Sequence, residues 1–469
     1  MTPTRRPPGP PQRLFRGSLP EFKRDVLGYM RQCAERYGDI VWFRLGPREC
    51  ILINHPDLIE TVLVKHHKNF IKHFAVRLAR PVLGNGLLTS EGDFWRRQRR
   101  LAAPAFHAER IATYGPDMVA ATVRMLESWH DGETHDIHAD MMQLTLDIVA
   151  KTLFGTDVGD ASQEVDRALH SALNSFASRI NSTIPLPVWV PTPGNLRFHA
   201  AVRGLNRVVQ KMIAERRRDG RERKDLLSIL LHARDEDDGG QMTDAQLADE
   251  ARTFLLAGHE TTALSLSWSW YLLAKHPQAQ AKLQAELESV LGDRLPEVSD
   301  LPKLKVAEQI ILESMRLYPP AFVIGREPLA DFELGGYTIR AGTTIFMSPW
   351  LMHRDGRYHE RPEQFEPERW ASERVQSLPK MAYFPFGGGP RICIGNTFAM
   401  MESVLLLATI ARQWSFKLVP DHPIELVPLF TLRPKYGIKV VIAKRAARDN
   451  DSPEATLRDS NCKPAVPAP

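Results

Sequence analysis

The sequence predicts a mainly α-helical chain with small β-sheets. Apolar residues recur at helical spacing over most of its length. Two runs rich in β-branched and aromatic residues, 39–45 and 50–53, flank a Gly-Pro turn and predict a small sheet ahead of the helices. A helical pattern also begins at the N-cap residue Thr243 and ends before Pro277. A helix of roughly thirty residues is far longer than usual, so we expect it to cross the centre of the domain.

The chain is expected to form one large domain with a disordered tail at each end. It has 469 residues, and no Gly/Ser linker, repeat or low-complexity segment lies between about residue 20 and residue 445. We therefore expect a single domain over residues 19–445 and disordered tails over 1–18 and 446–469. With 61 basic and 56 acidic residues, the net charge of +5 is too small and too dispersed to predict nucleic-acid binding.

Cysteine usage and the N-terminus bear on the cellular compartment. The four cysteines, Cys33, Cys50, Cys393 and Cys462, lie far apart without a CxxC pair, which favours a reducing compartment. Residues 1–20 are rich in Pro and Arg and lack the apolar core of a signal peptide. No run approaches the ~18 apolar residues that a membrane span requires. We expect a cytoplasmic protein without a membrane span.

The most distinctive segment is the glycine-rich decapeptide FGGGPRICIG at residues 386–395. Its glycines allow a flat ligand to approach closely. Cys393 stands at the start of an expected helix, where free N–H groups and the positive dipole end favour a thiolate. Gly395 leaves space beside the sulfur, and Arg391 can reach an anionic group. These features suit a haem iron with its propionates, where a thiolate ligand favours O–O cleavage; a buried structural cysteine is the plainer alternative.

The middle of the long helix carries an unusual cluster, AGHETT at residues 257–262. Glycine in a helix interior costs about 1 kcal/mol relative to alanine. Threonine hydroxyls can bond a carbonyl one turn earlier and open the helix locally. A weakened turn with an acid and two hydroxyls would suit proton delivery, although the pattern alone is more typical of a simple kink.

Two further residue pairs, Trp95/Arg99 and Glu313/Arg316, could serve a functional site or could be ordinary surface features. Trp95 and Arg99 place two donors on one helical face. The other arginines of residues 96–100 are typical of a solvated basic face, or of a docking site for an acidic electron donor. Glu313 and Arg316 lie three residues apart and can form an ion pair, which at a protein surface is worth under ~1 kcal/mol.

Taken together, these motifs resemble those of the cytochrome P-450 family. Five residues fall at the spacings of its cysteine-ligand signature: Phe386, Gly389, Arg391, Cys393 and Gly395. Five motifs follow in the family's order: Trp95/Arg99, the cluster at 258–262, Glu313/Arg316, Pro367–Trp370 and the Cys393 loop. The resemblance covers about residues 20–445. It implies a soluble bacterial-type haem-thiolate monooxygenase with haem b as its cofactor.

The resemblance also implies roles for individual residues. Cys393 would be the iron ligand, and Glu260 and Thr261 would form the acid–alcohol pair that supplies protons, with Ala257 and Gly258 leaving room for O₂. The other implied haem-binding residues are Trp95, Arg99, Arg326, Phe386, Arg391 and Gly395, and His353 is a further candidate for a propionate.

Other residues would fix the cysteine loop or line the substrate pocket. Glu313 and Arg316 would join Arg369 in a buried network that holds the loop. The expected pocket residues are Leu87, Leu88, Phe254, Ala321, Phe322, Val323 and Phe430. A proline-broken segment at 185–193 is predicted to form a lid, and a hairpin over 427–432 is predicted to place its tip in the pocket.

The implied reaction inserts one atom of O₂ into a lipophilic small molecule such as a fatty acid, alkane or terpenoid, by hydroxylation or epoxidation. No flavin domain, dinucleotide motif or iron–sulfur cysteine set follows residue 445, so a separate donor (ferredoxin or flavodoxin with a reductase) is expected. One alternative is a thiolate-haem peroxygenase or hydroperoxide isomerase that needs no reductase, against which the acid–alcohol pair argues. Another is a non-catalytic haem sensor or binding protein.

Overall fold

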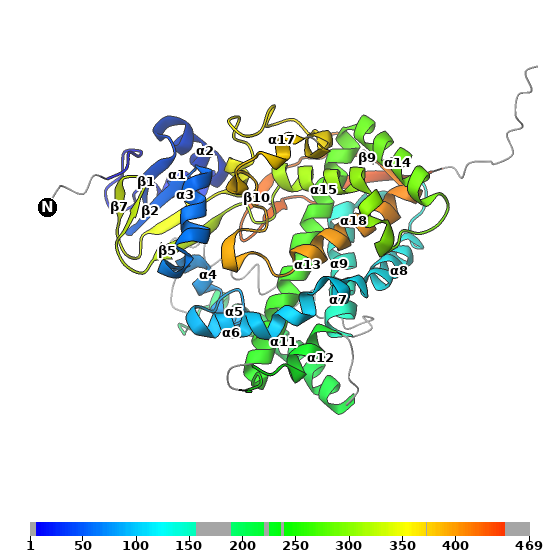
Figure 1. Ribbon diagram of the computed structural model, residues 1–469, viewed down its shortest axis with the longest axis horizontal. Coiled ribbons are helices and arrows are strands. Elements are labelled where there is room, and N and C mark those ends of the chain that lie inside the picture. Colours follow the sequence, from blue (N-terminus) through cyan, green and yellow to red (C-terminus); the bar gives the residue numbers. More distant parts are fainter. Residues whose placement is uncertain (1–5, 156–188, 220–224, 236–238, 372, 446–469) are drawn as a thin grey trace, which may run out of the picture.

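The fold is that of a computed structural model, which describes residues 6–155, 189–219, 225–235, 239–371 and 373–445. A helical part lies beside a part that contains the largest sheet (Figure 1). The mainly helical class with small sheets that the sequence predicts is confirmed. No helix among these described residues is both long and apolar enough to cross a membrane.

The helices are labelled as in Figure 1. They are α1 (Leu19–Arg24), α2 (Val26–Tyr37), α3 (Pro56–Glu60), α4 (Phe74–Leu78), α5 (Arg80–Leu83), α6 (Gly92–Ala102), α7 (Ala108–Ala112), α8 (Gly115–Leu126), α9 (Ile137–Phe154), α11 (Pro193–Asp219), α12 (Leu226–His232), α13 (Asp244–Lys275), α14 (Pro277–Leu291), α15 (Lys305–Leu317), α16 (Pro349–Met352), α17 (Glu373–Gln376) and α18 (Asn396–Gln413). Short helical turns join them, including η5 (Pro367–Ala371) and η7 (Gly389–Arg391).

The strands of the described residues form four small sheets. They are β1 (Ile40–Leu45), β2 (Arg48–Ile53), β3 (Phe70–Lys72), β4 (Thr134–Asp136), β5 (Ile324–Pro328), β6 (Phe332–Leu334), β7 (Tyr337–Ile339), β8 (Thr344–Met347), β9 (Trp414–Leu418), β10 (Leu426–Pro428), β11 (Leu432–Pro434) and β12 (Lys439–Lys444). The largest sheet has the order β1-β2-β8-β5-β3, and only β2 and β8 pair in parallel within it. The others are β4-β12-β9, β6-β7 and the hairpin β10-β11.

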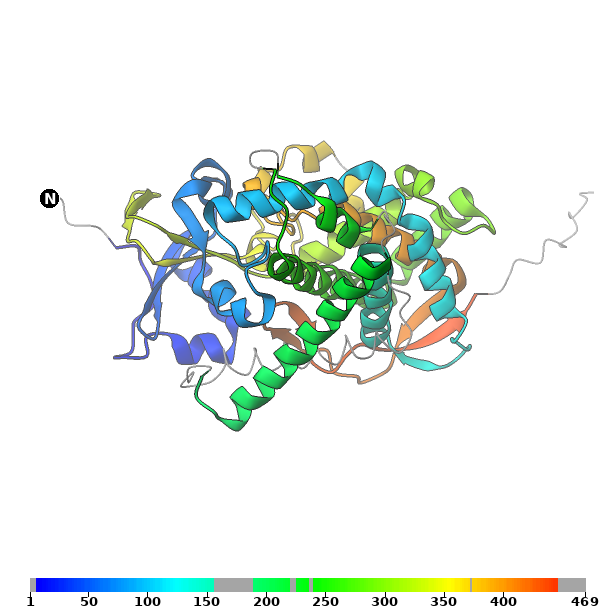
Figure 2. The ribbon, with the colours of Figure 1, turned by 90° about the horizontal axis from the view of Figure 1, so that it is seen from below.

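The long helix α13 lies at the centre of the helical part (Figures 1 and 2). Thr243 caps it, because its side chain accepts from the Gln246 N–H while the Gln246 side chain accepts from the Thr243 N–H. The helix runs for 32 residues and ends at Lys275, before Pro277, as predicted. Most of its residues are buried, so the helix is covered on nearly all sides, which is typical of a helix inside a large core.

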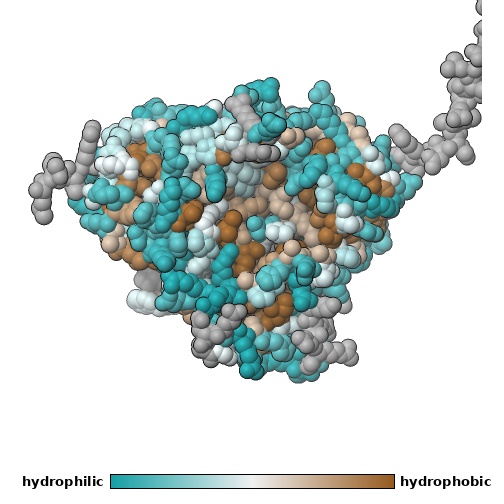
Figure 3. Space-filling view, viewed as in Figure 1, coloured by the Kyte–Doolittle hydropathy of each residue, from teal (hydrophilic) through white to brown (hydrophobic). Residues whose placement is uncertain are grey.

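The N-terminal segment differs from the disordered tail expected over residues 1–18. Residues 6–18 run beside the edge strand β1, where the Trp42 N–H donates to Pro8 O at 2.8 Å and Gly17 bridges Leu45. The prediction was wrong for this stretch because composition does not reveal that an edge strand offers unpaired backbone groups. Polar residues cover much of the molecular face in Figure 3, and apolar residues lie between them in separate patches.

Candidate active site

A cavity of about 1480 Å³ lies among α13, the cysteine loop, β5 and the β10–β11 hairpin. Such a volume accommodates a large cofactor together with a small molecule. Of the residues expected to bind haem, supply protons or line the substrate pocket, all except the propionate candidate His353 contribute to the wall of this cavity. The structure therefore brings together side chains from segments that are far apart in the sequence.

The cysteine loop is a tight turn packed against the chain after α3. Gly389 has a φ of +67°, and a Cβ at this position would lie 2.0 Å from Leu63 O, so only glycine fits. The Cys393 N–H donates to Phe386 O at 2.9 Å, which closes the loop three residues before α18 begins. The side chain of Cys393 faces the cavity.

The surroundings of Cys393 act on its pKa in opposing directions, and the helix start is not the largest effect. Burial raises the pKa of the Cys393 thiol, while the Gly395 N–H and the Arg99 guanidinium act in the opposite direction. Cys393 is exposed to the cavity, but the protein atoms that surround it on its other sides desolvate the sulfur, and this effect outweighs both groups. A metal ion bound to a thiol overrides this balance, since coordination deprotonates it outright.

A cluster of buried cations lies next to the cysteine loop. Burial and, to a smaller extent, repulsion by Arg391 together lower the pKa of Arg326 from β5 to about 10. Burial and the same two arginines also hold the pKa of Lys72 well below its usual range. Glu91 contacts Arg391, and Glu91 and Glu250 are the acids that act on Lys72 in this group. Positive charge therefore exceeds negative charge here, and an anionic ligand would relieve the repulsion.

Trp95 and Arg99 lie on α6 at the edge of the same cluster. The Arg391 guanidinium stacks over the Trp95 ring at 4.1 Å, and Arg99 Nη1 donates to Ile392 O at 2.9 Å. Arg99 thus binds the backbone of the cysteine loop as well as facing the cavity. Two neighbouring arginines expected on a solvated face, Arg97 and Arg100, are instead held by the buried carboxylate of Asp235, at 3.5 and 3.1 Å.

The central turn of α13 forms another wall of the cavity. Thr261 Oγ1 donates to Ala257 O at 2.6 Å, which is the back-bonding expected for a threonine in a helix. Glu260 is 1% exposed, and its Oε1 accepts from Arg433 Nε at 2.6 Å and from the Thr431 hydroxyl. Sequence reasoning missed Arg433 and Thr431, because the hairpin that carries them is about 170 residues downstream of Glu260.

The structure gives a reason for the glycine at position 258 that differs from the expected one, which was room for O₂. A Cβ at Gly258 would lie 3.0 Å from Val149 Cγ2, so the missing side chain lets α13 approach α9 closely. The backbone of Gly258 still borders the cavity. A side chain at position 258 would point toward α9 and not into the cavity. The close packing of α13 against α9 therefore accounts for the glycine.

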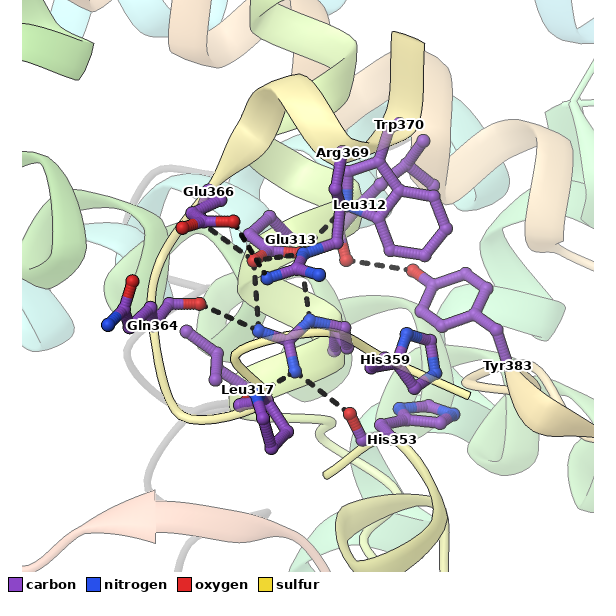
Figure 4. A network of polar contacts seen from close by, with 12 residues as sticks. Leu312, Glu313, Leu317, His353, His359, Gln364, Glu366, Arg369, Trp370 and Tyr383 are labelled. Carbon is purple, nitrogen blue, oxygen red and sulfur yellow. Dashed lines mark hydrogen bonds and ion pairs between the residues drawn. The ribbon is translucent and has the colours of Figure 1, made fainter. Parts of the chain in front are cut away.

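Glu313 is the centre of a buried ion-pair network (Figure 4). Its carboxylate accepts two bonds from Arg316, each 2.9 Å, and one from Arg369 Nε at 2.9 Å. Trp370 Nε1 donates to it at 2.9 Å. Glu313 and Arg316 are both fully buried, so this is not the exposed pair that the plain interpretation allowed.

The network reaches the segment that leads into the cysteine loop. The Tyr383 hydroxyl donates to Leu312 O at 2.9 Å, and the Phe384 N–H donates to His353 Nε2 at 2.9 Å. His353 also offers its carbonyl to Arg316 at 2.8 Å. The suggestion that His353 binds a propionate is therefore wrong, because its ring is held behind the loop and does not border the cavity.

The loop that contains Leu87 and Leu88 borders the cavity and is held in place by two residues that sequence reasoning did not identify. Glu250 Oε2 accepts from the Leu87 N–H at 2.9 Å, and Lys72 Nζ donates to Leu87 O at 2.9 Å and to Leu88 O. Two sequence signals could have indicated them: Lys72 ends an apolar strand, and Glu250 is an acid within an otherwise apolar face of the long helix. The predicted lid at 185–193 begins outside the described residues, so it stays a prediction.

With the geometry in hand, comparison with known proteins identifies the class. The family model of cytochrome P-450 matches residues 7–441. The chain belongs to this family. It is 38% identical over 398 residues to cyclooctatin synthase of Streptomyces melanosporofaciens, covering 84% of this chain and 87% of that one. It is 36% identical over 397 residues to pentalenene oxygenase of Streptomyces avermitilis, covering 84% and 88%.

A plant relative shows how widely the likeness extends. The protein LUTEIN DEFICIENT 5 of Arabidopsis thaliana is 31% identical over 436 residues, covering 87% of this chain and 72% of that protein. Cytochromes P-450 are haem-thiolate monooxygenases, so the enzyme class and the cofactor follow from membership. The cavity fits that cofactor, since it combines a thiol on one wall with unneutralised buried cations at the edge where propionates would lie.

Proposed function

We propose that this cytochrome P-450 oxidises an apolar terpenoid. The observation that carries the proposal is the apolar lining of the cavity, to which Leu87, Phe254, Phe322 and Phe430 contribute. Relatives at 36–38% identity carry the names cyclooctatin synthase, cyclooctat-9-en-7-ol 5-monooxygenase and pentalenene oxygenase. A rigid hydrocarbon is held by such a wall through buried apolar area, without a charged anchor.

The residues of the site have distinct proposed tasks. Cys393 would hold the haem iron, and Arg326, Arg391, Lys72 and Trp95 would bind the propionates by charge and hydrogen bonding. The bound haem supplies O₂ activation, which the protein side chains cannot perform. The apolar wall would orient the substrate and keep water away from it.

The central turn of α13 would deliver the protons. The Thr261 hydroxyl borders the cavity and is held by Ala257 O, so its position is defined. Glu260 would supply protons to this hydroxyl, and Arg433 would hold the carboxyl on the hairpin side. Because Glu260 Oε2 has no hydrogen-bond partner among the described residues, it is the oxygen free to exchange a proton.

We also propose that electrons come from a separate ferredoxin or flavodoxin with its reductase, and that the protein works in the cytoplasm. Three cysteines of the described residues, Cys33, Cys50 and Cys393, are free thiols, which supports a reducing compartment.

Reconstituted turnover tests the proposal. With ferredoxin, reductase and NADPH, cyclic terpene hydrocarbons and alcohols should shift the haem spin state and give oxygenated products, whereas hydrophilic compounds should do neither. Thr261→Ala should lower product per NADPH by roughly tenfold or more and release peroxide. Thr152→Ala is the matched control, because Thr152 makes the same back-bond on α9 without bordering the cavity.

Two outcomes would contradict the proposal. Equal product and coupling in Thr261→Ala and the unmodified enzyme would remove the proton-delivery role of α13. Full turnover with peroxide alone, and none with the electron-transfer partners, would favour the peroxygenase alternative.

A further inference from the structure

One histidine in the wall of the cavity has no part in the tasks proposed above. His73 lies between β3 and α4, and it borders the cavity. Neither nitrogen of its ring forms a hydrogen bond with another described residue, and Nδ1 is buried. Nε2 is therefore the nitrogen that a molecule in the cavity can reach. Polar groups in protein interiors are normally hydrogen-bonded, so this nitrogen lacks a partner that a ligand can supply.

The position of the His73 ring is fixed by its neighbours. A Cβ on Gly325 of β5 would lie 2.4 Å from His73 Cγ, so the glycine makes room for the imidazole. Phe346 of β8 and Phe74 of α4 contact the ring nearly at right angles, with centroids 5.9 and 5.8 Å away. Edge-to-face contacts are a preferred aromatic geometry. The imidazole is thus held in place before any ligand binds.

His73 lies on the other face of the largest sheet from the buried cations near the cysteine loop. Lys72 and Arg326 are direct partners in the register of β3 and β5. Successive side chains of a strand point to opposite faces, so His73 faces away from both cations. Phe346, which contacts His73, belongs to the core cluster that includes Met30 of α2. The imidazole therefore faces the part of the cavity between this sheet and α2.

The imidazole is uncharged near neutral pH. Burial and, to a smaller extent, repulsion by Arg326 and Arg77 lower the pKa of His73 to about 4. A neutral imidazole has one donor nitrogen and one acceptor nitrogen. A hydroxyl both donates and accepts, so it can bond Nε2 in either tautomer. An uncharged ring offers no counter-charge to a carboxylate, whose desolvation would be costly here.

The cavity wall around this nitrogen is otherwise apolar. Phe22 of α1 packs against Phe346 with centroids 6.3 Å apart, and both border the cavity together with Val26 and Met30 of α2. Such a wall holds a hydrocarbon skeleton through buried apolar area, while a single polar group fixes its orientation. A pure hydrocarbon would cover Nε2 without replacing its hydrogen bond to water, at a cost in affinity.

We propose that His73 is a substrate-binding residue whose Nε2 forms a hydrogen bond with a hydroxyl group already present on the terpenoid. The skeleton of the substrate lies along the apolar wall, and the hydroxyl is held at the α2 end of the cavity. The enzyme then acts after a reaction that has already placed oxygen on the hydrocarbon. This inference rests on the proposed terpenoid oxidation and narrows its substrate class.

Calorimetric titration of the holoenzyme tests this contact without turnover. Cedrol and cedrane, a terpene alcohol and its parent hydrocarbon, are matched probes. The ratio of their dissociation constants should favour cedrol about tenfold more in the unmodified enzyme than in His73→Phe. The variant should bind cedrol more weakly and cedrane more tightly, and general damage to the fold would not produce these opposite changes. His73→Gln keeps a donor and an acceptor and should recover most of the preference.

The matched control is His66→Phe. His66 also contacts a phenylalanine ring, that of Phe332 at 5.3 Å, but it is exposed and does not border the cavity. This variant should keep the ratio of the unmodified enzyme. The same ratio in His73→Phe would overturn the inference even if terpenoids are oxidised normally. So would lower haem content in His73→Phe with an unchanged ratio, which would assign His73 to the cofactor. Binding of neither probe to the unmodified enzyme would contradict the terpenoid function itself, and the inference with it.

Discussion

Glu250 shows how a single buried carboxyl holds the loop above the pocket. Its Oε2 accepts from the Leu87 N–H, yet burial raises its pKa to about 7, and the neighbouring Asp249 adds to this effect. The Leu87 N–H and Lys72 act in the opposite direction. Near neutral pH the residue is therefore poised between a neutral and a charged form.

The raised pKa of Glu250 makes the stability of the fold fall as pH rises. Because the folded-state pKa lies above that of the unfolded chain, the folded protein binds more protons between pH 4.5 and about 7. Glu250 should therefore lower stability as pH rises through this window, by up to about 3 kcal/mol, with little change above or below it. Melting temperatures of Glu250→Gln and the unmodified protein should converge at the acidic end and diverge in favour of the variant by pH 8.

The exposed acid Glu109 provides the control for this measurement. Glu109→Gln should follow the unmodified protein at every pH. A Glu250→Gln curve parallel to the unmodified one from pH 4.5 to 8 would show that Glu250 does not titrate in this range.

At the scale of elements, the cysteine loop depends on one close backbone approach. Gly389 stands in η7 with a positive φ, and its Cα faces Leu63 O at a distance that excludes any side chain. Gly342, in the turn before β8, also has a positive φ (+75°) but has open space around it. Substitutions at Gly389 and Gly342 should both strain the backbone, but only the substitution at Gly389 should also create a steric clash. Comparing them separates the two effects.

We expect Gly389→Ala to destabilise the protein by about 3 kcal/mol or more, and to reduce the fraction of protein that gives a normal carbon monoxide difference spectrum. Gly342→Ala should cost only the left-handed strain, about 1–2 kcal/mol, and should keep the spectrum. Thermal unfolding and haem content measure both effects. Equal losses in the two variants would mean that contact with Leu63 is unimportant.

At the scale of the whole molecule, the Glu313 network connects α15, η5 and the chain before the cysteine loop. Arg316 donates to the carbonyls of His353, Pro362 and Gln364 in addition to Glu313. These bonds fix a long irregular segment that has little regular secondary structure of its own. The cysteine loop is thus positioned by charged residues that do not border the cavity.

Removing the charge at Glu313 should be severe. Glu313→Gln leaves Arg316 buried without its counter-charge and leaves Arg369 only its longer contact with Glu366, 3.4 Å. We expect a loss of roughly 3–5 kcal/mol together with lower haem retention. The exposed pair Lys282–Glu368 is the control, and Glu368→Gln should change stability by under ~1 kcal/mol. Similar small effects from both variants would argue that the network is not needed for the fold.

The local elements could be read from the sequence because their signals are local. The helix from Thr243 to Lys275, the strands around residues 40–53 and the β10–β11 hairpin all follow from capping, periodicity and turn residues. The cysteine signature and the α13 cluster have fixed spacings, so the family and its cofactor could be expected from residue order. These features need no knowledge of what lies across the fold.

Only the tertiary structure decided the partners of these residues. Glu260 accepts hydrogen bonds from Arg433 and Thr431, Lys72 lies near Arg326 and Arg391, and His353 lies behind the cysteine loop. These contacts join residues from 31 to more than 170 positions apart, and no spacing rule encodes them. The sequence by itself determined the class of chemistry, whereas the fold decided which charges surround it, because desolvation and contact exist only after the chain has packed.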